Sequence, residues 1–215
     1  MNQPLAAIIA SGDSCTAWLA NEPPNLDKAR AAVSRIVQAA TQASEIVQRI
    51  RGLFHKRTSM AEALDVNGLI QETISIVARE AQRKNVDLRT ELDAGLPSVS
   101  VDRIQLQQVI LNLIINGIEA MAGLDTEPKS LLIRSGLPNQ RELLVSVADT
   151  GPGIDPGHAS RLFAAFFTTK PQGIGMGLRI SRSIIEAHGG RLWAEKNEPH
   201  GAVFHLTLPI KSSQV

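Results

Sequence analysis

Residues 102–121 read DRIQLQQVILNLIINGIEAM, and this predicted helix decides how the rest of the chain is arranged. Apolar residues fall on almost every side of it, which is typical of a helix buried within a fold. Polar residues spaced by three and four nevertheless share one face: Gln105, Gln108, Asn112, Asn116 and Glu119. A solvated stripe explains such a face in an ordinary helix, but two uncharged amides one turn apart in the apolar middle weaken that explanation. An Asn oxygen can ligate a hard cation such as Mg²⁺ without adding charge.

The stretch ELLVSVAD, residues 142–149, reads as a strand and runs directly into TGPGI. A carboxylate at the end of a buried strand, here Asp149, can accept a hydrogen bond from an exocyclic amine such as that of adenine. Gly151 and Gly153 then let the backbone approach a flat ring closely. Many turns after strands share this pattern, so taken alone it is equally compatible with an ordinary turn.

A second glycine cluster, in QGIGMGLRI at residues 172–180, precedes a predicted helix. Gly173, Gly175 and Gly177 place amide groups at the helix N-terminus, where the helix dipole favours phosphate. The cluster is not a Walker loop, because no Gly-Lys-Ser/Thr follows it. It is not a Rossmann signature either, because no apolar strand leads directly into it.

Roughly twenty residues separate the two glycine clusters, which is too long for a plain connection and indicates a lid over a ligand. Within this lid, FFTTK at residues 166–170 puts Thr168, Thr169 and Lys170 where they can meet phosphate oxygens. A solvated surface lysine explains Lys170 equally well when that residue is considered alone.

Composition sets outer bounds on function. The chain has 215 residues, with 22 basic and 21 acidic side chains and a formal charge of +1. This balance disfavours nucleic acid as the main partner, since a clustered basic surplus would be expected for it. The single cysteine, Cys15, excludes an internal disulfide and favours a reducing, cytoplasmic compartment. The longest apolar runs fall far short of the roughly 20 residues that span a bilayer, so no membrane segment is expected.

Residues 1–58 contain no strand-like alternation and predict a helical hairpin. Apolar residues recur at helical spacing up to the break NEPPNLD, where a cap is expected at Asn25 or Asp27. A second apolar seam then runs from Val33 to Phe54. A hairpin this long cannot bury its seam alone, so we expect two copies to pair into a dimeric four-helix bundle. Packing of the hairpin against the rest of its own chain is the alternative.

Residues 63–212 change to mixed helix and strand. Asn67 and Asp102 are expected to cap helices, the second with Gln105 three residues on, as in a capping box. Strands are expected at VDLRTEL, LLIRS, ELLVSVAD, GRLWAEK and AVFHLTLPI, with turns at residues 136–139 and 197–201. The absence of repeated βαβ units predicts an α+β chain whose second domain is an α/β sandwich, with helices on one face of a mixed sheet.

Four motifs follow one another in order: an Asn-bearing helix, Asp-x-Gly-x-Gly, a lid with Phe-Phe-Thr-Thr-Lys, and Gly-x-Gly-x-Gly opening a helix. Together they resemble the ATP-binding domain of sensor histidine kinases of two-component systems. NLIINGIEAM resembles the N-box of that family, DTGPGI its first glycine box, RLFAAFFTTK its F-box and GIGMGL its second glycine box. The hairpin resembles the family's dimerisation and phosphotransfer domain, so the resemblance covers essentially the whole chain. It implies the sandwich ATPase fold of gyrase, heat-shock chaperones, histidine kinases and MutL.

The resemblance implies ATP and Mg²⁺ as ligands and gives roles to the boxes. Asn116 would ligate Mg²⁺, Asp149 would hold adenine, and Lys170 is a candidate phosphate contact. The implied ATP-binding residues are Asn112, Asn116, Asp149, Gly151, Gly153, Thr168, Thr169, Lys170, Gly173, Gly175, Met176, Gly177 and Leu178. The implied function is signal transduction by phosphorelay, in which a homodimeric kinase transfers the γ-phosphate of ATP to a histidine. The phosphoryl group then passes to an aspartate of a response regulator receiver domain.

Two positions bear on the reaction. Ala164-Ala165 replaces the acidic-proline pair usual in the F-box, which puts lid rigidity, rather than nucleotide binding, in doubt. In the gyrase, MutL and chaperone ATPases, a glutamate one turn before the metal-binding Asn activates water. Here that position is Asn112, whose amide cannot act as a general base, so phosphoryl transfer to a side chain is favoured over hydrolysis. The alternatives are an ATPase of the gyrase and chaperone type, or a non-catalytic dimeric adaptor that binds a response regulator.

The first residues, MNQPL, match the tail of the family's phosphoacceptor stretch His-Glu-x-Asn-Gln-Pro-Leu. By that match the acceptor histidine and its acidic neighbour would lie just before Met1. We therefore expect a kinase core that binds Mg·ATP without phosphorylating itself at the usual place. The five histidines of the chain are expected to be structural or solvated.

Overall fold

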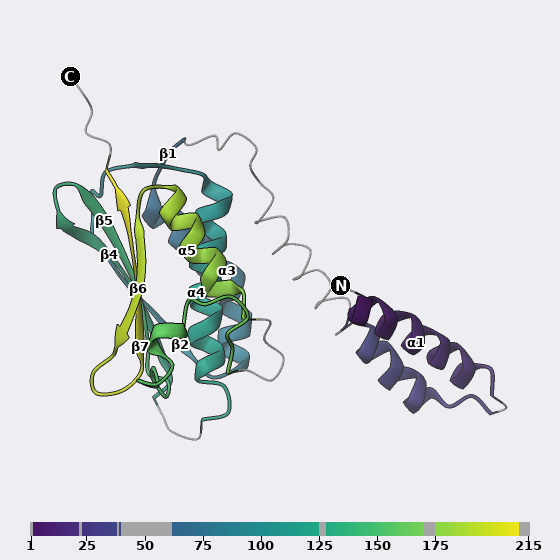
Figure 1. Cartoon of the computed structure of the whole chain (residues 1–215). Helices are drawn as coiled ribbons and strands as arrows, with labels where there is room; N and C mark the ends of the chain where they lie inside the picture. The colour runs from purple at the N-terminus through teal and green to yellow at the C-terminus, as the bar shows by residue number, and fades with distance from the viewer. Residues whose placement is uncertain are drawn as a thin grey trace. The chain divides into compact units, whose positions relative to one another are not determined.

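The computed structural model of the protein describes residues 2–21, 23–37, 39, 62–124, 128–169 and 175–210. The chain divides into two compact units, Met1–Lys56 and Arg57–Val215 (Figure 1). The assignment of domains to residues 1–58 and 63–212 stays a prediction, because residues 40–61 lie outside the described part of the chain.

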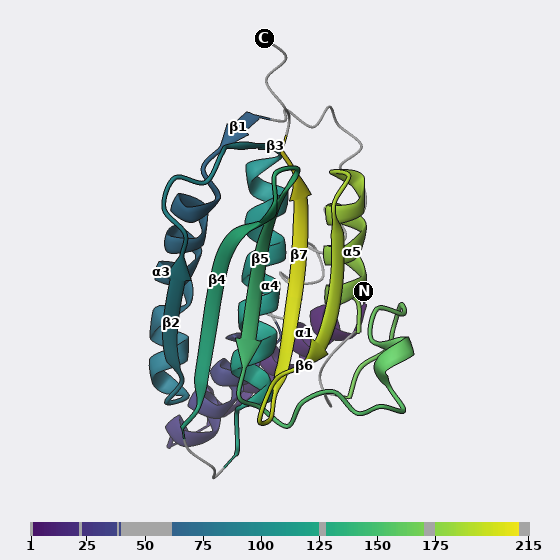
Figure 2. The ribbon, with the colours of Figure 1, turned by 90° about the vertical axis from the view of Figure 1, so that its left-hand side faces the viewer.

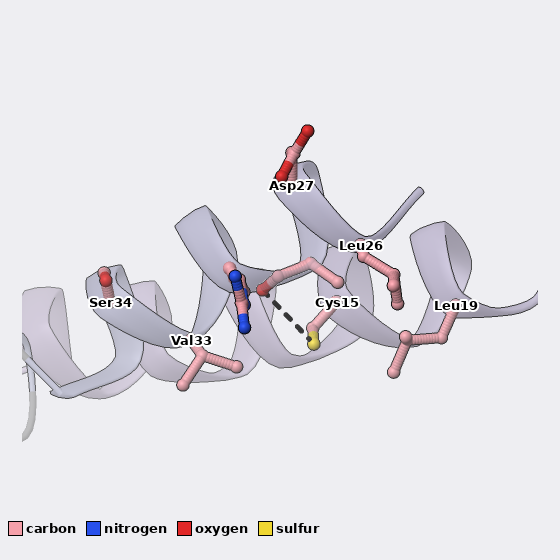
Figure 3. A pocket seen from close by; sticks show the side chains of 8 residues that line it. Cys15, Leu19, Leu26, Asp27, Val33 and Ser34 are labelled. Atoms are coloured by element: carbon pink, nitrogen blue, oxygen red, sulfur yellow. Dashed lines mark hydrogen bonds between the residues drawn. The ribbon is translucent and has the colours of Figure 1, made fainter. Parts of the chain in front are cut away.

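The first unit contains helix α1, Asn2–Leu19, and a second helical stretch over residues 26–37. Asn25 Oδ1 accepts a hydrogen bond from the backbone N–H of Lys28 at 3.0 Å, so Asn25 caps the second stretch, as predicted. Cys15 of α1 donates to the carbonyl of Ala29 at 3.6 Å, which places the two helices side by side (Figure 3). The remainder of the predicted second arm, from residue 40 onward, lies outside the described residues.

The second unit is built on a five-stranded mixed sheet in the order β2-β4-β5-β7-β6. Neighbouring strands are antiparallel except β2 and β4, which are parallel. The strands are β2, Asp87–Leu92; β4, Ser130–Asn139; β5, Glu142–Asp149; β6, Arg191–Lys196; and β7, Ala202–Pro209. A separate small sheet pairs two strands that the sequence did not predict, β1, Glu62–Leu64, and β3, Val99–Val101. Each has three residues, too few for alternation to be recognised.

Three helices cover one face of the five-stranded sheet: α3, Val66–Arg83; α4, Arg103–Ala120; and α5, Gly177–Ala187 (Figure 2). Helix α4 is the middle one, and both α3 and α5 pack against it. Its fully buried side chains include Leu106, Ile110, Leu113, Ile114 and Ile118. The predicted α/β sandwich, with a largely buried helix at its centre, is therefore confirmed. No helix in the described ranges is both long and apolar enough to cross a membrane.

Helix starts were predicted correctly at one position and wrongly at another. Asp102 Oδ1 accepts a hydrogen bond from the backbone N–H of Gln105 at 3.0 Å and so caps α4, as expected. The cap of α3 is Asp65 rather than Asn67, because Asp65 Oδ1 accepts from the Asn67 N–H at 3.0 Å. Asn67 lies inside the helix, and its Nδ2 donates instead to the carbonyl of Asp93 at 2.8 Å.

Both predicted hairpins are confirmed, but one turn was placed too early. Strands β6 and β7 pair antiparallel on either side of residues 197–201, as expected. Strands β4 and β5 also pair antiparallel, as expected, but the turn predicted around residues 136–139 lies later in the chain, because β4 continues through Asn139 and pairs there with Glu142. A register shift between Gly136 and Asn139 accommodates the Leu-Pro pair that the sequence suggested as a turn.

The face of the sheet away from the helices carries a row of paired side chains. Strand register aligns Glu91, Arg134, Ser146, His205 and Trp193 across all five strands. Arg134 and Glu91 form an ion pair at 2.6 Å, and His205 Nδ1 shares a hydrogen bond with Ser146 Oγ at 2.8 Å. The His205 ring stacks on Trp193. Burial in this row lowers the pKa of His205 below its ordinary value.

Candidate nucleotide site

Asp149 is the last residue of β5 and is only 2% exposed. A buried carboxylate needs hydrogen-bond donors to offset the loss of water. Its Oδ1 accepts from the backbone N–H groups of Gly151 at 2.8 Å and Ala202 at 3.2 Å. The main-chain oxygen of Asp149 accepts from Asn197 Nδ2 at 2.8 Å. The residue is thus held between the first glycine cluster and the turn that joins β6 to β7.

The C-terminal half of α4 passes beside this end of β5. A Cβ added at Gly117 would lie 3.5 Å from the Cβ of Asp149 and would overlap Leu131, so glycine lets the helix approach the sheet. Asn116 directly precedes Gly117, and Asn112 lies one turn earlier on the same half-buried face. The amide-bearing face of α4 and the buried carboxylate therefore come from adjacent elements.

Helix α5 is joined to α4 at its first two turns. Asn112 Nδ2 donates a hydrogen bond to Ser181 Oγ at 3.0 Å, and Ser181 is buried. A Cβ added at Gly177 would lie 2.5 Å from Asn112 Oδ1, a distance that real Cβ contacts do not reach, so a larger residue there would require Asn112 or the start of α5 to shift. Met176, at the N-cap position of α5, makes no side-chain hydrogen bond to the first turn. An N-terminus capped by no side chain is suited to an anion.

The described part of the segment between the two glycine clusters, up to residue 169, is a loop that contains one short 3₁₀ helix, η1, Ala159–Arg161. Thr168 and Thr169 are exposed near the end of its described part. Two of the predicted phosphate-contacting residues, Lys170 and Gly173, lie outside the described residues.

The remaining predicted residues lie at the borders of this loop. The position of a Cβ on Gly153 is 2.9 Å from the carbonyl oxygen of Gly201, so the first glycine cluster abuts the β6–β7 turn. A Cβ on Gly175 would lie 2.5 Å from the carbonyl oxygen of Phe167, so Gly175 packs closely on the backbone of this loop. Met176 and Leu178 are half-buried against the hydrophobic core, so their side chains serve packing.

Two residues that shape this site were missed by sequence reasoning. Asn197 sits in a turn, where asparagine is common for local reasons, and its contact with Asp149 depends on how the strands pair. Ser181 lies among Ile180, Ile184 and Ile185 on the buried face of α5. A serine on an otherwise apolar helix face was the only signal available for it.

Three of the four histidines in the described ranges have structural contacts, and the fourth, His200, is exposed. His188 Nδ1 bonds to the carbonyl of Ile184 at 2.8 Å, and Nε2 accepts from the Asp102 N–H at 3.1 Å, which ties the end of α5 to the start of α4. His205 belongs to the row on the open face of the sheet. The ring of His158 packs against Phe167 with centroids 5.3 Å apart.

Comparison with known proteins places this architecture. A family model described as "Histidine kinase-, DNA gyrase B-, and HSP90-like ATPase" matches residues 101–212, just over half of the chain. The sensor histidine kinase TmoS of Ectopseudomonas mendocina is 36% identical over 212 residues, covering 98% of this chain and 22% of TmoS. The sensor protein FixL of Bradyrhizobium diazoefficiens is 40% identical over 210 residues, covering 97% of this chain and 41% of FixL.

Solved structures agree with these relatives. The nucleotide-free catalytic domain of histidine kinase ThkA has a TM-score of 0.61 and 35% identity, covering 69% of this chain and 95% of that domain. ThkA in complex with the response regulator TrrA has a TM-score of 0.69 and 28% identity, covering 97% of this chain and 58% of ThkA.

The chain belongs to the histidine kinase-, DNA gyrase B- and HSP90-like ATPase family. Within that family it carries the ATP-binding catalytic core of a sensor histidine kinase. It spans about a fifth of the length of TmoS and about two-fifths of the length of FixL.

Proposed function

We propose that this chain binds Mg·ATP at the end of the sandwich where α4, β5 and α5 meet, for transfer of the γ-phosphate to a histidine. The observation that carries the proposal is the conjunction of three features at that end. The buried carboxylate of Asp149 accepts hydrogen bonds from backbone N–H groups. The amides of Asn112 and Asn116 lie on the adjacent face of α4, and Asn112 also contacts the start of α5.

Asp149 would recognise the base. An ionised carboxylate offers about four acceptor positions on its two oxygens, so it can accept backbone N–H groups and also an amine. The exocyclic amine of adenine is a donor of the required kind, whereas guanine presents a carbonyl oxygen at the corresponding position. Because Asp149 is buried and fixed, an incorrect partner would leave it unsatisfied, which is how such sites discriminate strongly.

Asn116 and the start of α5 would serve the phosphates. The half-buried amide oxygen of Asn116 fits the preference of Mg²⁺ for oxygen ligands, and Mg²⁺ usually takes few ligands from the protein when phosphates supply others. When bound, Mg²⁺ would neutralise charge on the transferred phosphoryl group. The N–H groups at the first turn of α5, with Thr168, Thr169 and Lys170 from the lid, would hold the phosphate oxygens in position for transfer.

Transfer to a side chain is favoured over hydrolysis by the surroundings of Asn112. Its Nδ2 donates to Ser181 Oγ, and its Oδ1 faces Gly177. An amide held in this way joins α4 to α5 and takes no proton from water, so no general base stands one turn before Asn116.

We further propose that the kinase acts as a homodimer through its helical hairpin. Three apolar side chains of the hairpin are exposed around one hollow: Leu19 at 49%, Leu26 at 63% and Val33 at 48% (Figure 3). A second hairpin packed here would bury them in a four-helix bundle.

The proposed partner that receives the phosphoryl group is a response regulator receiver domain. This follows from the similarity to ThkA, a histidine kinase solved in complex with a response regulator. We also propose a cytoplasmic location, because the cytoplasm supplies ATP and keeps the lone Cys15 reduced.

The metal assignment is tested with Asn116→Ala, with Gln105→Ala on the same face of α4 as the control. We expect Asn116→Ala to abolish the Mg²⁺-dependent part of ATP binding, measured by calorimetric titration with and without Mg²⁺, while Gln105→Ala retains it. Normal Mg·ATP binding by Asn116→Ala would show that the metal is held elsewhere.

The transfer itself is tested with γ-labelled ATP and Mg²⁺, using the chain beside a version with His-Glu added before Met1. Acid-labile phosphate on the extended version alone is the expected result. Labelling of the chain without the extension would place the acceptor at one of its own histidines.

A further inference from the structure

The turn between β6 and β7 reaches across to the end of β5, about fifty positions away in the sequence. The turn is closed by a hydrogen bond from the Asn197 N–H to the carbonyl of Gly201 at 3.0 Å. From this closed turn, Asn197 Nδ2 donates to the main-chain oxygen of Asp149 at 2.8 Å. The residue after the turn, Ala202, donates its N–H to Asp149 Oδ1 at 3.2 Å. The main chain and the side chain of Asp149 are thus held by the same turn.

Steric contacts reinforce these hydrogen bonds. Gly201 has φ of +113°, and a Cβ there would overlap the main-chain oxygen of Asp149. On the other side of the turn, a Cβ on Gly153 would lie 2.9 Å from the carbonyl oxygen of Gly201. The turn therefore fits between the last residue of β5 and the first glycine cluster, with no room for either to shift.

Strand register explains why a side chain is needed here. The pairing of β5 with β7 runs from Glu142 opposite Pro209 to Ala148 opposite Val203 and stops there. Asp149 follows directly. It remains paired with Leu131 of β4, but the ladder to β7 no longer fixes its backbone on the other side. At that point the side-chain amide of Asn197 donates the hydrogen bond that a β7 backbone N–H would otherwise give to the carbonyl of Asp149.

We propose that Asn197 is a positioning residue for base selection: by fixing the end of β5, it aims the Asp149 carboxylate at the exocyclic amine of adenine and so sets the preference for ATP over GTP. The proposal rests on the proposed role of Asp149 in binding adenine. Asn197 acts only through Asp149. It should therefore affect discrimination between bases, without affecting the contacts to phosphates and metal that all nucleotides share.

The test uses Asn197→Ala and Asn197→Asp, the second of which keeps the shape of the side chain and removes the donor. Asn139→Ala is the matched control, since Asn139 is the last residue of β4 and its side chain accepts from Arg141 in the turn at the opposite end of β5. Dissociation constants for ATP and GTP are measured by competition against a fluorescent adenine nucleotide, and melting temperatures are recorded alongside. Asn197→Ala and Asn197→Asp should bind ATP roughly three- to tenfold more weakly, the range typical of one lost hydrogen bond. Their GTP affinity should stay within about twofold of the unaltered chain, so the ATP/GTP ratio falls.

If Asn197 had a merely structural role, both variants would bind ATP and GTP equally more weakly, and the ratio of the two affinities would not change. That result would overturn the proposal. Asp149→Asn, measured in the same way, separates this failure from failure of the proposed function. If Asp149→Asn abolishes the preference for ATP and the Asn197 variants retain it, only the role of Asn197 is wrong. If Asp149→Asn retains the preference, Asp149 does not read the base, and both proposals fall.

Discussion

The two ends of the candidate nucleotide site are built in different ways. At the adenine end, Asp149 is 2% exposed and is held by Gly151 of the first glycine cluster and by Asn197 and Ala202 at the β6–β7 turn. At the phosphate end, the candidate groups are half-buried amides, the first turn of a helix, and exposed threonines of a loop. The proposed base contact is thus buried and held by backbone groups, whereas the proposed phosphate contacts are half-buried or exposed.

The largest expected effect comes from breaking the adenine end with Asp149→Asn. With the amide oxygen still accepting from the backbone N–H groups of Gly151 and Ala202, the N–H₂ group would meet the adenine amine, donor against donor, so ATP affinity should fall by about 100-fold or more. Calorimetric titration measures the loss, and Asp87→Asn, on the exposed edge strand β2, is the matched control. A loss of less than about threefold would mean that Asp149 is not the base contact.

Gly177→Ala should damage the phosphate end alone. The added methyl group would meet Asn112 Oδ1 at 2.5 Å and push the start of α5 away from α4. We expect ATP affinity to fall by roughly tenfold, while adenosine, which lacks phosphates, binds as before. Gly12→Ala, where an added Cβ meets nothing within 4 Å, is the control. Equal losses for ATP and adenosine would show that the two ends are not separable.

A smaller effect is expected from Ser181→Ala, which removes the acceptor for Asn112 Nδ2. The loss of one hydrogen bond should cost about 1 kcal/mol of unfolding free energy and reduce ATP affinity by about threefold. Ser75→Ala is the control, because the Ser75 hydroxyl is exposed and bonds only within its own helix, to Gln71. Urea unfolding and ATP titration of both variants provide the comparison. An unchanged ATP affinity in Ser181→Ala would mean that the hydrogen bond between α4 and α5 does not organise the phosphate end.

The smallest expected effect is on the pH dependence of stability. It concerns His205, which lies on the open face of the sheet, away from both ends of the candidate site. Burial lowers the folded-state pKa of His205, and the charge of Glu195 acts in the opposite direction. The unfolded chain then takes up the proton more readily, so this contribution to stability is complete above the ordinary pKa of about 6.5 and is lost as pH falls through the lowered value. Unfolding free energies measured from about pH 8 to pH 5 should fall less steeply for His205→Gln than for the unaltered chain. Equal slopes would contradict the burial argument, and ATP affinity at neutral pH should not change.

Features governed by local sequence were predicted well. The cap at Asp102, the strand that ends at Asp149 and the helix after the second glycine cluster each follow from residues within a few positions of one another. The cap of α3 was assigned to Asn67 instead of Asp65 because both residue types favour the same position. Local signals did not separate them.

Features that depend on tertiary pairing were not predicted. The bond from Asn197 to Asp149 exists only because β7 pairs with β5 and brings the preceding turn to the end of that strand. Ser181 meets Asn112 only because α5 packs beside α4. The motifs thus predicted the candidate site residues, whereas Asn197 and Ser181, which contact two of them, became visible only in the fold.

The most direct test of the adenine end is a ¹H–¹⁵N NMR titration of the chain with a non-hydrolysable ATP analogue and Mg²⁺. The N–H groups of Gly151 and Ala202, which donate to Asp149 Oδ1, should shift together as the analogue binds, while the N–H of Arg134 on the open face should not. The corresponding guanine analogue should leave all three unmoved at the same concentration. Saturable binding of the ATP analogue with no shift at Gly151 or Ala202 would contradict the assignment of Asp149 as the residue that recognises the base.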